Sequence, residues 1–350
     1  MKRSWLLALL LCAYPLDGSA QAALPKIVIL ATGGTIAGSA DSSTSGGYQS
    51  GQVAVDVLIK AVPQLSTVAS VTGEQISNIG SQNMNDEVWL KLAKRVNELA
   101  RTGIDGIVIT HGTDTMEETA YFLSLVAHTS KPIVLTGSMR PSTAISADGP
   151  VNIFNAVAVA ADAKAQGRGV LVVLNDEIHD ARSVFKSHTT KVSTFKSGDH
   201  GLLGEVQYGA ITFYRGPPAL HTFASPFFVE HVQTLPRVDI VYIHEGVDGG
   251  LIEAAAKLGA RGIVTAGVGN GNMTDAALAA LAKVAEQGVV AVRSSRVITG
   301  PTGRKVEVDD DALGLVASYE LTPAKARILL RLALLTTSEP ATIQALFQSF

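Results

Sequence analysis

The feature that most constrains the fold is a series of short apolar segments in which polar and apolar residues do not alternate. These segments, rich in Val and Ile, occupy residues 26–31, 106–110, 132–136 and 169–174. A strand with one face in water alternates, whereas a strand covered on both faces does not. Helical segments separate them, one with Asn85 as its N-cap and one over residues 116–128. The sequence therefore predicts a mostly parallel sheet flanked by helices.

A second, shorter series of the same kind follows in the C-terminal third of the chain. Strands are expected at residues 238–243, 262–266 and 289–293, and helices are expected to begin at Thr274 and at Thr322-Pro323. Residues 214–236 contain Pro217, Pro218, Pro226 and Pro236 and no clear period, which indicates a linker. We expect an N-terminal catalytic α/β domain over residues 23–214, a linker over 215–236 and a C-terminal α/β domain over 237–350.

The first twenty-two residues are typical of a secretory signal. Lys2 and Arg3 precede an apolar run, and small residues occupy the positions that determine cleavage after Ala22. The only cysteine, Cys12, lies inside this segment. We therefore expect a periplasmic or secreted protein without disulfides, cysteine nucleophile or thiolate metal site.

Composition disfavours several classes of function. The formal net charge is −3 and no dense Lys/Arg stripe occurs, which disfavours nucleic-acid binding. No G-x-S-x-G or H-x-x-x-H pattern is present, so neither an α/β-hydrolase nor a histidine metal site is indicated. We expect no metal and no cofactor, and we interpret the isolated histidines as surface or capping residues.

The first strand leads directly into a glycine-rich segment, residues 31–38, followed by a Gly/Ser tract that ends at Gly51. In a doubly wound sheet, ligands bind at the carboxyl ends of strands, where a glycine-rich turn exposes backbone N–H groups. Because Tyr48 lies within the tract, we interpret the tract as a lid with an aromatic hydroxyl. The alternative is a tight turn and a surface loop without function. The glycine spacing does not match the dinucleotide-binding pattern.

A second polar cluster, residues 110–118, follows another strand of the same sheet. Taken alone, Thr113 and Asp114 are most simply an N-cap and a first-turn acid. Two strand ends of one sheet both present Gly-Thr, however, and neighbouring strand ends face one crevice, which favours a shared site. Ser81 and Gln82 supply a third hydroxyl and amide pair in a nearby polar loop.

Together these segments resemble the bacterial type II L-asparaginases, which are exported amidohydrolases of asparagine. The two signature motifs of that family correspond to residues 31–37 and 110–115, and supporting stretches are residues 78–82, 139–142, 146–150, 266–272 and 293–296. The resemblance implies a two-domain asparaginase-type fold with a larger N-terminal, mostly parallel sheet and a smaller C-terminal α/β domain. It also implies a homotetramer, a dimer of intimate dimers with shared active sites.

The resemblance also implies roles for particular residues. Thr35 is expected as the nucleophile with Tyr48 as its partner in the lid, and Thr113, Asp114 and Lys186 as a second catalytic group. The substrate-binding residues that it implies are Gly34, Ser81, Gln82, Thr113, Asp114 and Asn272, and Asn272 and the catalytic Glu307 are expected from the adjacent subunit. The implied reaction converts L-asparagine to L-aspartate and ammonia, with lower activity on L-glutamine.

The chemistry of the residues agrees with such a reaction. A threonine hydroxyl becomes a nucleophile when a neighbouring base accepts its proton, and backbone N–H groups at a Gly-Thr turn can hold an oxyanion. A free amino acid needs a carboxylate for its ammonium group and a hydroxyl for its carboxylate, and Asp114 and Ser81 are of these types. A periplasmic solute-binding protein is the alternative from another class; it needs the same two residues but no nucleophile.

Overall fold

The computed structural model describes residues 23–38 and 54–350. The expected signal segment and Tyr48 lie outside these residues. Within the described residues, no helix is both long and apolar enough to cross a membrane.

An eight-stranded sheet forms the centre of the N-terminal domain, with the strand order β10-β9-β6-β5-β4-β3-β1-β2. The strands from β2 to β5 in this order run parallel, and antiparallel pairing adds β6, β9 and β10. They are β1 (Lys26–Gly33), β2 (Ser70–Ile79), β3 (Gly106–Thr110), β4 (Ile133–Thr136), β5 (Val170–Leu174), β6 (Glu177–Asp180), β9 (Gly204–Gln207) and β10 (Ala210–Phe213). A separate hairpin pairs β7 (Phe185–Lys186) with β8 (Phe195–Lys196).

Helices cover both faces of this sheet, as the apolar segments predict. On one face, α1 (Val55–Lys60) and α4 (Gly149–Ala161) pack against Ile27 and Ile29 of β1. On the other face, α2 (Asp86–Ala100) and α3 (Met116–Val126) pack in the core that contains Val28 and Leu30. Successive residues of β1 therefore enter two different apolar cores, which is why the strand does not alternate.

The C-terminal domain repeats this plan around a smaller sheet in which all strands are parallel, in the order β11-β12-β13-β14. One face carries α5 and α6 and the other carries α7 and α8. The elements are β11 (Val238–Tyr242), α5 (Gly250–Lys257), β12 (Gly262–Gly267), α6 (Asp275–Glu286), β13 (Val290–Ser295), β14 (Leu315–Ala317), α7 (Pro323–Ala333) and α8 (Pro340–Ser349).

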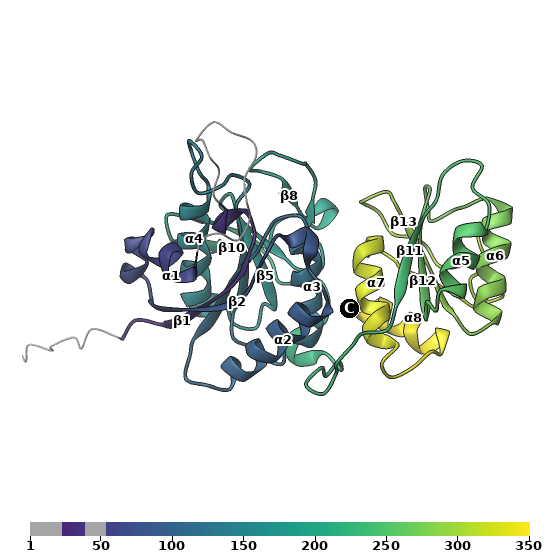
Figure 1. Ribbon diagram of the computed structural model, residues 1–350, viewed down its shortest axis with the longest axis horizontal. Helices are drawn as coiled ribbons and strands as arrows, with labels where there is room; N and C mark the ends of the chain where they lie inside the picture. Colours follow the sequence, from purple (N-terminus) through teal and green to yellow (C-terminus); the bar gives the residue numbers. More distant parts are fainter. Residues whose placement is uncertain (1–22, 39–53) are drawn as a thin grey trace, which may run out of the picture.

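The two domains share one apolar core. Figure 1 shows α3 of the N-terminal domain facing α7 of the C-terminal domain. Phe122 of α3 and Leu329 of α7 are fully buried in the same cluster, which continues to Phe347 of α8. The fold is therefore a stack of layers in which two helical layers meet between two sheets.

Several local predictions from the sequence are confirmed. The Asn85 side chain accepts a hydrogen bond from the Val88 N–H over 3.1 Å at the start of α2, and Thr274 caps α6 through the Ala277 N–H over 3.2 Å. Pro323 begins α7. The sequence predicts neither β2 nor the antiparallel strands β6, β9 and β10. Between β10 and β11, the expected linker contains only a short 3-10 turn over Thr222–Ala224.

Candidate functional site

Thr35 and Thr113 follow the carboxyl ends of two adjacent strands of the larger sheet, β1 and β3. β1 lies between β2 on one side and β3 on the other, so the strand order changes direction beside β1. Open α/β sheets form their ligand crevice at such a point. The Thr32 hydroxyl donates to the Thr110 carbonyl over 2.9 Å and ties the ends of β1 and β3 together.

Glycine allows the two turns after these strands to touch. Gly34 has a φ of +83°, and a Cβ at this position would lie 2.3 Å from the backbone nitrogen of Gly112. No other residue type fits this close approach without displacing one turn. The Gly34 N–H donates to the Ile79 carbonyl over 3.0 Å, so an oxyanion at this turn would take its hydrogen bond from another N–H group. Gly34, the residue before the 3-10 helix η1 (Thr35–Ala37), therefore lies directly against Gly112.

Lys186 joins Thr113 and Asp114 in a polar cluster. Its Nζ lies 2.6 Å from Asp114 Oδ1 and 3.0 Å from Thr113 Oγ1. The Lys186 side chain is 17 % exposed and that of Asp114 59 % exposed, whereas Thr113 is buried. The N-cap of α3 is Thr115, so neither Thr113 nor Asp114 occupies the capping position that a purely structural interpretation required. The structure brings together three residues that are more than seventy positions apart at their extremes.

Ser81 extends this cluster from the end of β2. It is buried at the start of the 3-10 helix η3 (Ser81–Asn83), and its hydroxyl oxygen accepts the Asp114 N–H over 3.1 Å. The Thr115 hydroxyl donates to the Ser81 carbonyl over 2.8 Å. Gln82, the next residue, is exposed. The loop after β2 is thus hydrogen-bonded to the turn that carries Asp114.

His111 supports the same turn from the interior. The Trp89 indole N–H donates to Thr119 Oγ1 over 2.8 Å, which leaves the Thr119 hydroxyl proton to donate to His111 Nε2 over 2.9 Å. The Nδ1–H then donates to the Gly112 carbonyl over 2.7 Å. Burial lowers the pKa of His111 to about 4, so its ring is neutral near pH 7.

The interpretation of the histidines as surface or capping residues is wrong at two positions. His111 and His179 are both completely buried. His179 lies on β6, with Nδ1 2.8 Å from the Ser197 hydroxyl. Such burial depends on partners remote in sequence, because Thr119 for His111 and Ser197 for His179 supply hydrogen bonds that replace those to water.

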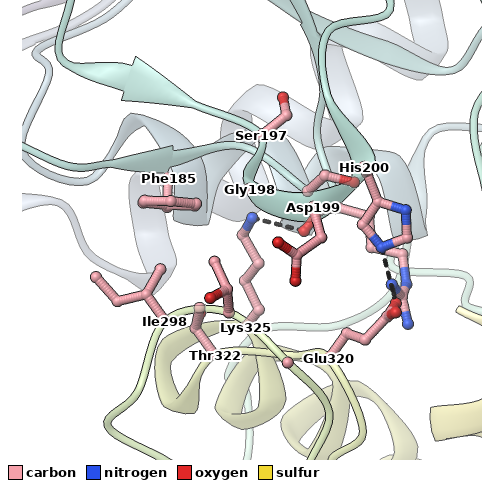
Figure 2. Close-up of a pocket in the computed structure, with 13 residues that line it drawn as sticks. Phe185, Ser197, Gly198, Asp199, His200, Ile298, Glu320, Thr322 and Lys325 are labelled. Carbon is pink, nitrogen blue, oxygen red and sulfur yellow. Dashed lines mark hydrogen bonds and ion pairs between the residues drawn. The ribbon is translucent and has the colours of Figure 1, made fainter.

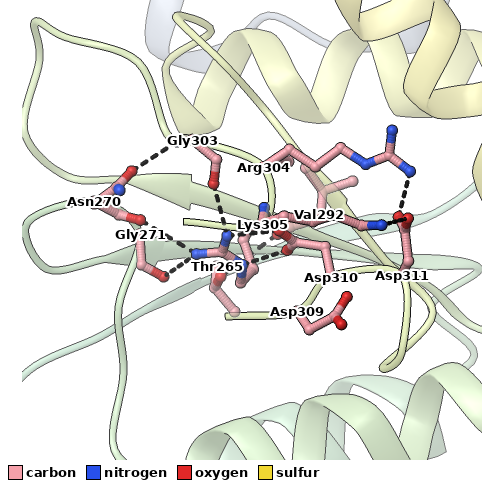
Figure 3. A network of polar contacts seen from close by, with 12 residues as sticks. Thr265, Asn270, Gly271, Val292, Gly303, Arg304, Lys305, Asp309, Asp310 and Asp311 are labelled. Atoms are coloured by element: carbon pink, nitrogen blue, oxygen red, sulfur yellow. Dashed lines mark hydrogen bonds and ion pairs between the residues drawn. The ribbon is translucent and has the colours of Figure 1, made fainter. Parts of the chain in front are cut away.

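Asn272 and Glu307 lie together in the C-terminal domain. The Asn272 amide donates to a Glu307 carboxylate oxygen. Arg293 holds the two loops that carry them: its guanidinium forms a buried ion pair with Asp310, at 2.6 Å from Nε to Oδ1, and donates to the Gly303 carbonyl over 3.0 Å. The same guanidinium donates to the Asn270 carbonyl, and Figure 3 shows how these loops converge. The predicted partner-side residues therefore share one surface.

Within residues 23–38 and 54–350, no group of three or more His, Cys, Asp and Glu side chains is placed to hold a metal ion. What the described residues do offer is hydroxyl groups, a lysine and a carboxylate at one crevice. These are the groups needed to activate a hydroxyl nucleophile and to bind a small zwitterion.

Two residues that support Lys186 are not predicted from the sequence. Glu117, in the first turn of α3, accepts the Lys186 backbone N–H over 2.5 Å. Lys325 of α7 contacts the same segment from the other domain. In the sequence, Glu117 is indistinguishable from an ordinary first-turn acid, and Lys325 from an exposed helical lysine.

Comparison with known proteins gives a consistent result. The family model described as Asparaginase, N-terminal matches residues 26–219, and that described as Glutaminase/Asparaginase C-terminal domain matches residues 237–347. A Haemophilus influenzae protein named probable L-asparaginase periplasmic is 54 % identical over 93 % of each chain. A glutaminase-asparaginase of Pseudomonas fluorescens is 46 % identical over 93 % of this chain and 91 % of its own. A crystal structure described as probable cytoplasmic L-asparaginase from Campylobacter jejuni has a TM-score of 0.91 and 47 % identity, covering 93 % of this chain and all of the other.

Proposed function

Because this chain belongs to the asparaginase family, we propose that it hydrolyses the side-chain amide of L-asparagine to give L-aspartate and ammonia. The observation that carries this proposal is the contact of Lys186 with Thr113 and Asp114 beside the turn that bears Thr35. A site that only bound an amino acid would need Asp114 and Ser81. It would not need Lys186 in contact with the buried Thr113, beside the turn that carries the buried Thr35.

In the proposed reaction, Thr35 Oγ attacks the side-chain amide carbon and its proton passes to a base. The carbon–nitrogen bond breaks as the base passes this proton to the amide nitrogen, which leaves as ammonia. Water then hydrolyses the acyl-threonine ester to aspartate and free Thr35. Tyr48 is the proposed partner of Thr35 in this transfer, and Thr113, Asp114 and Lys186 form the second catalytic group. The Lys186 ammonium group lies within hydrogen-bond distance of both the Thr113 hydroxyl oxygen and the Asp114 carboxylate.

The proposed binding of the substrate follows from charge. The exposed Asp114 carboxylate pairs with the α-ammonium group, and the Ser81 hydroxyl donates to the α-carboxylate. Gly34 has no side chain that could bind the substrate, but it allows the turns after β1 and β3 to lie against each other. Gln82 and Asn272 line the pocket at the α-carbon end of the substrate. Glu307, hydrogen-bonded to Asn272, is the catalytic residue that the adjacent subunit supplies.

We further propose that the protein is exported and assembles as a dimer of intimate dimers with shared sites. The Haemophilus relative is named periplasmic and the Campylobacter structure cytoplasmic, so the apolar leader of this chain is the feature that supports export.

Ammonia release by the purified protein tests the proposed function. We expect release from asparagine by the wild type, and a loss of at least about a hundredfold in kcat for Thr35→Ala and for Thr113→Val, because loss of an activated nucleophile or of a group that supports it raises the barrier by several kcal/mol. Thr67→Val, at an exposed turn, is the matched control and keeps wild-type activity. Tight binding of asparagine without ammonia release would instead identify a solute-binding protein.

The value of kcat/KM for glutamine, compared with that for asparagine, tests the proposed substrate specificity. The extra methylene of glutamine displaces either the amide from Thr35 or the α-groups from Asp114, a misfit of about 1–3 kcal/mol, or roughly ten- to two-hundredfold in kcat/KM. We expect Gln82→Glu and Asn272→Ser to change the ratio of kcat/KM for the two substrates. Equal values for both substrates on the wild type contradict the preference, and an unchanged ratio in both variants assigns specificity to other residues.

A further inference from the structure

Lys325 is a buried cation at the boundary between the domains. Its side chain is 1 % exposed, although it begins on α7 of the C-terminal domain. The Nζ donates to the Arg182 carbonyl over 2.7 Å and to the Val184 carbonyl. Figure 2 shows Lys325 extending from its helix towards the N-terminal domain, beside the cleft that Asp199 and Phe185 also line.

The two carbonyls that accept these hydrogen bonds belong to the segment that ends in Lys186. They lie four and two residues before it, and the Lys186 N–H is itself held by Glu117 of α3. The segment is therefore fixed from two directions. Glu117 holds it from the catalytic domain, and Lys325 holds it from the C-terminal domain of the same chain.

We propose that Lys325 is a positioning residue for catalysis, which holds the 182–186 segment so that the Lys186 ammonium group meets Thr113 and Asp114. This inference rests on the proposed function of Lys186. It gives the C-terminal domain a catalytic task within its own chain, separate from any residue that it supplies to a partner subunit.

The cost of burying Lys325 supports this role. Burial lowers the pKa of Lys325 to about 8, whereas a Met or Leu would fill the same space without desolvating a charge. The surrounding charges only partly compensate for burial. The charged groups that face the ammonium or line its cleft are Glu117 and Glu118 of α3, Asp180 of β6, Arg182, Asp199, His200 and Glu320.

Kinetics of Lys325→Met test the proposal. Removal of Nζ leaves two carbonyls without their donor, and we expect kcat to fall at least about tenfold, because small misplacement of a catalytic group is costly. KM should stay within about threefold, since Ser81 and Asp114 remain. Arg331→Met is the matched control: Arg331 is buried on the same helix, but it donates to the Pro236 carbonyl and the Asp86 carboxylate rather than to the 182–186 segment. We expect Arg331→Met to lower stability but to keep wild-type kcat.

A double-mutant cycle separates positioning from a general structural effect. If Lys325 acts through Lys186, Lys325→Met changes kcat less than about twofold in a Lys186→Met background. An undiminished effect in that background, or wild-type kcat in Lys325→Met alone, overturns the inference. Wild-type kcat in Lys186→Met alone contradicts the proposed function instead.

A crystal structure of Lys325→Met provides a test that does not depend on activity. We expect the contact between Lys186 Nζ and Thr113 Oγ1, 3.0 Å in the wild type, to lengthen beyond hydrogen-bond distance. An unchanged contact in a folded variant overturns the inference even if the wild type releases no ammonia.

Discussion

At the scale of single residues, the Gly112–Thr113 turn depends on buried polar side chains that hydrogen-bond to one another. His111 is the clearest case, because the hydrogen bonds from Thr119 and to Gly112 are compatible with one neutral tautomer. Protonation would place a second donor against the Thr119 hydroxyl, which already accepts from Trp89. The ring therefore acts as a support for the Gly112–Thr113 turn in its neutral form.

This arrangement predicts a pH dependence of stability. The folded-state pKa of His111, about 4, lies below the unfolded value of 6.5, so protons bind the unfolded chain more tightly. Its contribution to stability is present above pH 6.5 and is lost as pH falls toward 4, by about 2 kcal/mol between pH 7 and 5. We expect the free energy of unfolding of His111→Asn to fall less steeply with acid by that amount.

Denaturant unfolding at pH 7 and pH 5, at one protein concentration, measures the difference. The matched control is His244→Asn at an exposed position, which should follow the wild type at both pH values. A His111→Asn protein with the same acid dependence as the wild type contradicts the assignment of a neutral buried ring.

At the scale of elements, the decisive feature is the contact between the turns after β1 and β3. Gly34→Ala places a methyl group 2.3 Å from the Gly112 nitrogen at a φ of +83°. The turns must separate, and Thr35 then moves relative to Thr113 and Lys186. We expect kcat to fall by about a hundredfold or more in a protein that still folds.

Gly167→Ala controls for backbone strain alone. Gly167 has a φ of +70°, but a Cβ there meets no atom within 4 Å. This variant should lose about 1 kcal/mol of stability and keep wild-type kcat. Similar kcat values for Gly34→Ala and the wild type would show that the turns tolerate separation and that their contact does not set the site.

The elements also show what the sequence could predict. Parallel strands and capped helices carry local signals, such as the run of Ile and Val in β3 and the Asn85 cap, and these predictions are confirmed. The antiparallel strands β6, β9 and β10 have only four residues each, too few for a period to emerge. Burial of Lys325 depends on carbonyls more than 140 positions away, so no local pattern distinguishes it from an exposed lysine.

Some residues of the candidate site can likewise be predicted from the sequence, and others cannot. Thr35, Thr113 and Asp114 follow strands that the sequence predicts, so topology predicts their proximity. Ser81 follows β2, which the sequence does not reveal, so its place beside Asp114 is seen only in the structure. Lys186 lies on a two-residue strand, and only the family resemblance singled it out. Glu117 and His111 depend on tertiary partners, and their supporting contacts could be seen only in the structure.

At the scale of the whole molecule, the predicted site residues fall into two groups on different domains. Thr35, Thr113 and Lys186 belong to the N-terminal domain, whereas Asn272 and Glu307 share a surface of the C-terminal domain that Arg293 organises. The proposed intimate dimer would bring the second group of one subunit to the first group of the other. An isologous dimer then contains two such composite sites.

Mixing of inactive variants tests this arrangement. A heterodimer of Thr35→Ala and Glu307→Ala contains one site with both defects and one site with neither. With random exchange of equal amounts, half of the dimers are mixed, so we expect about a quarter of wild-type ammonia release. The matched control mixes Thr35→Ala with Thr113→Val, which alter the same side of the site, and this mixture should stay inactive. Activity in the control, or none in the first mixture despite verified subunit exchange, contradicts a site shared in this way, because recovery depends on the two groups coming from different chains.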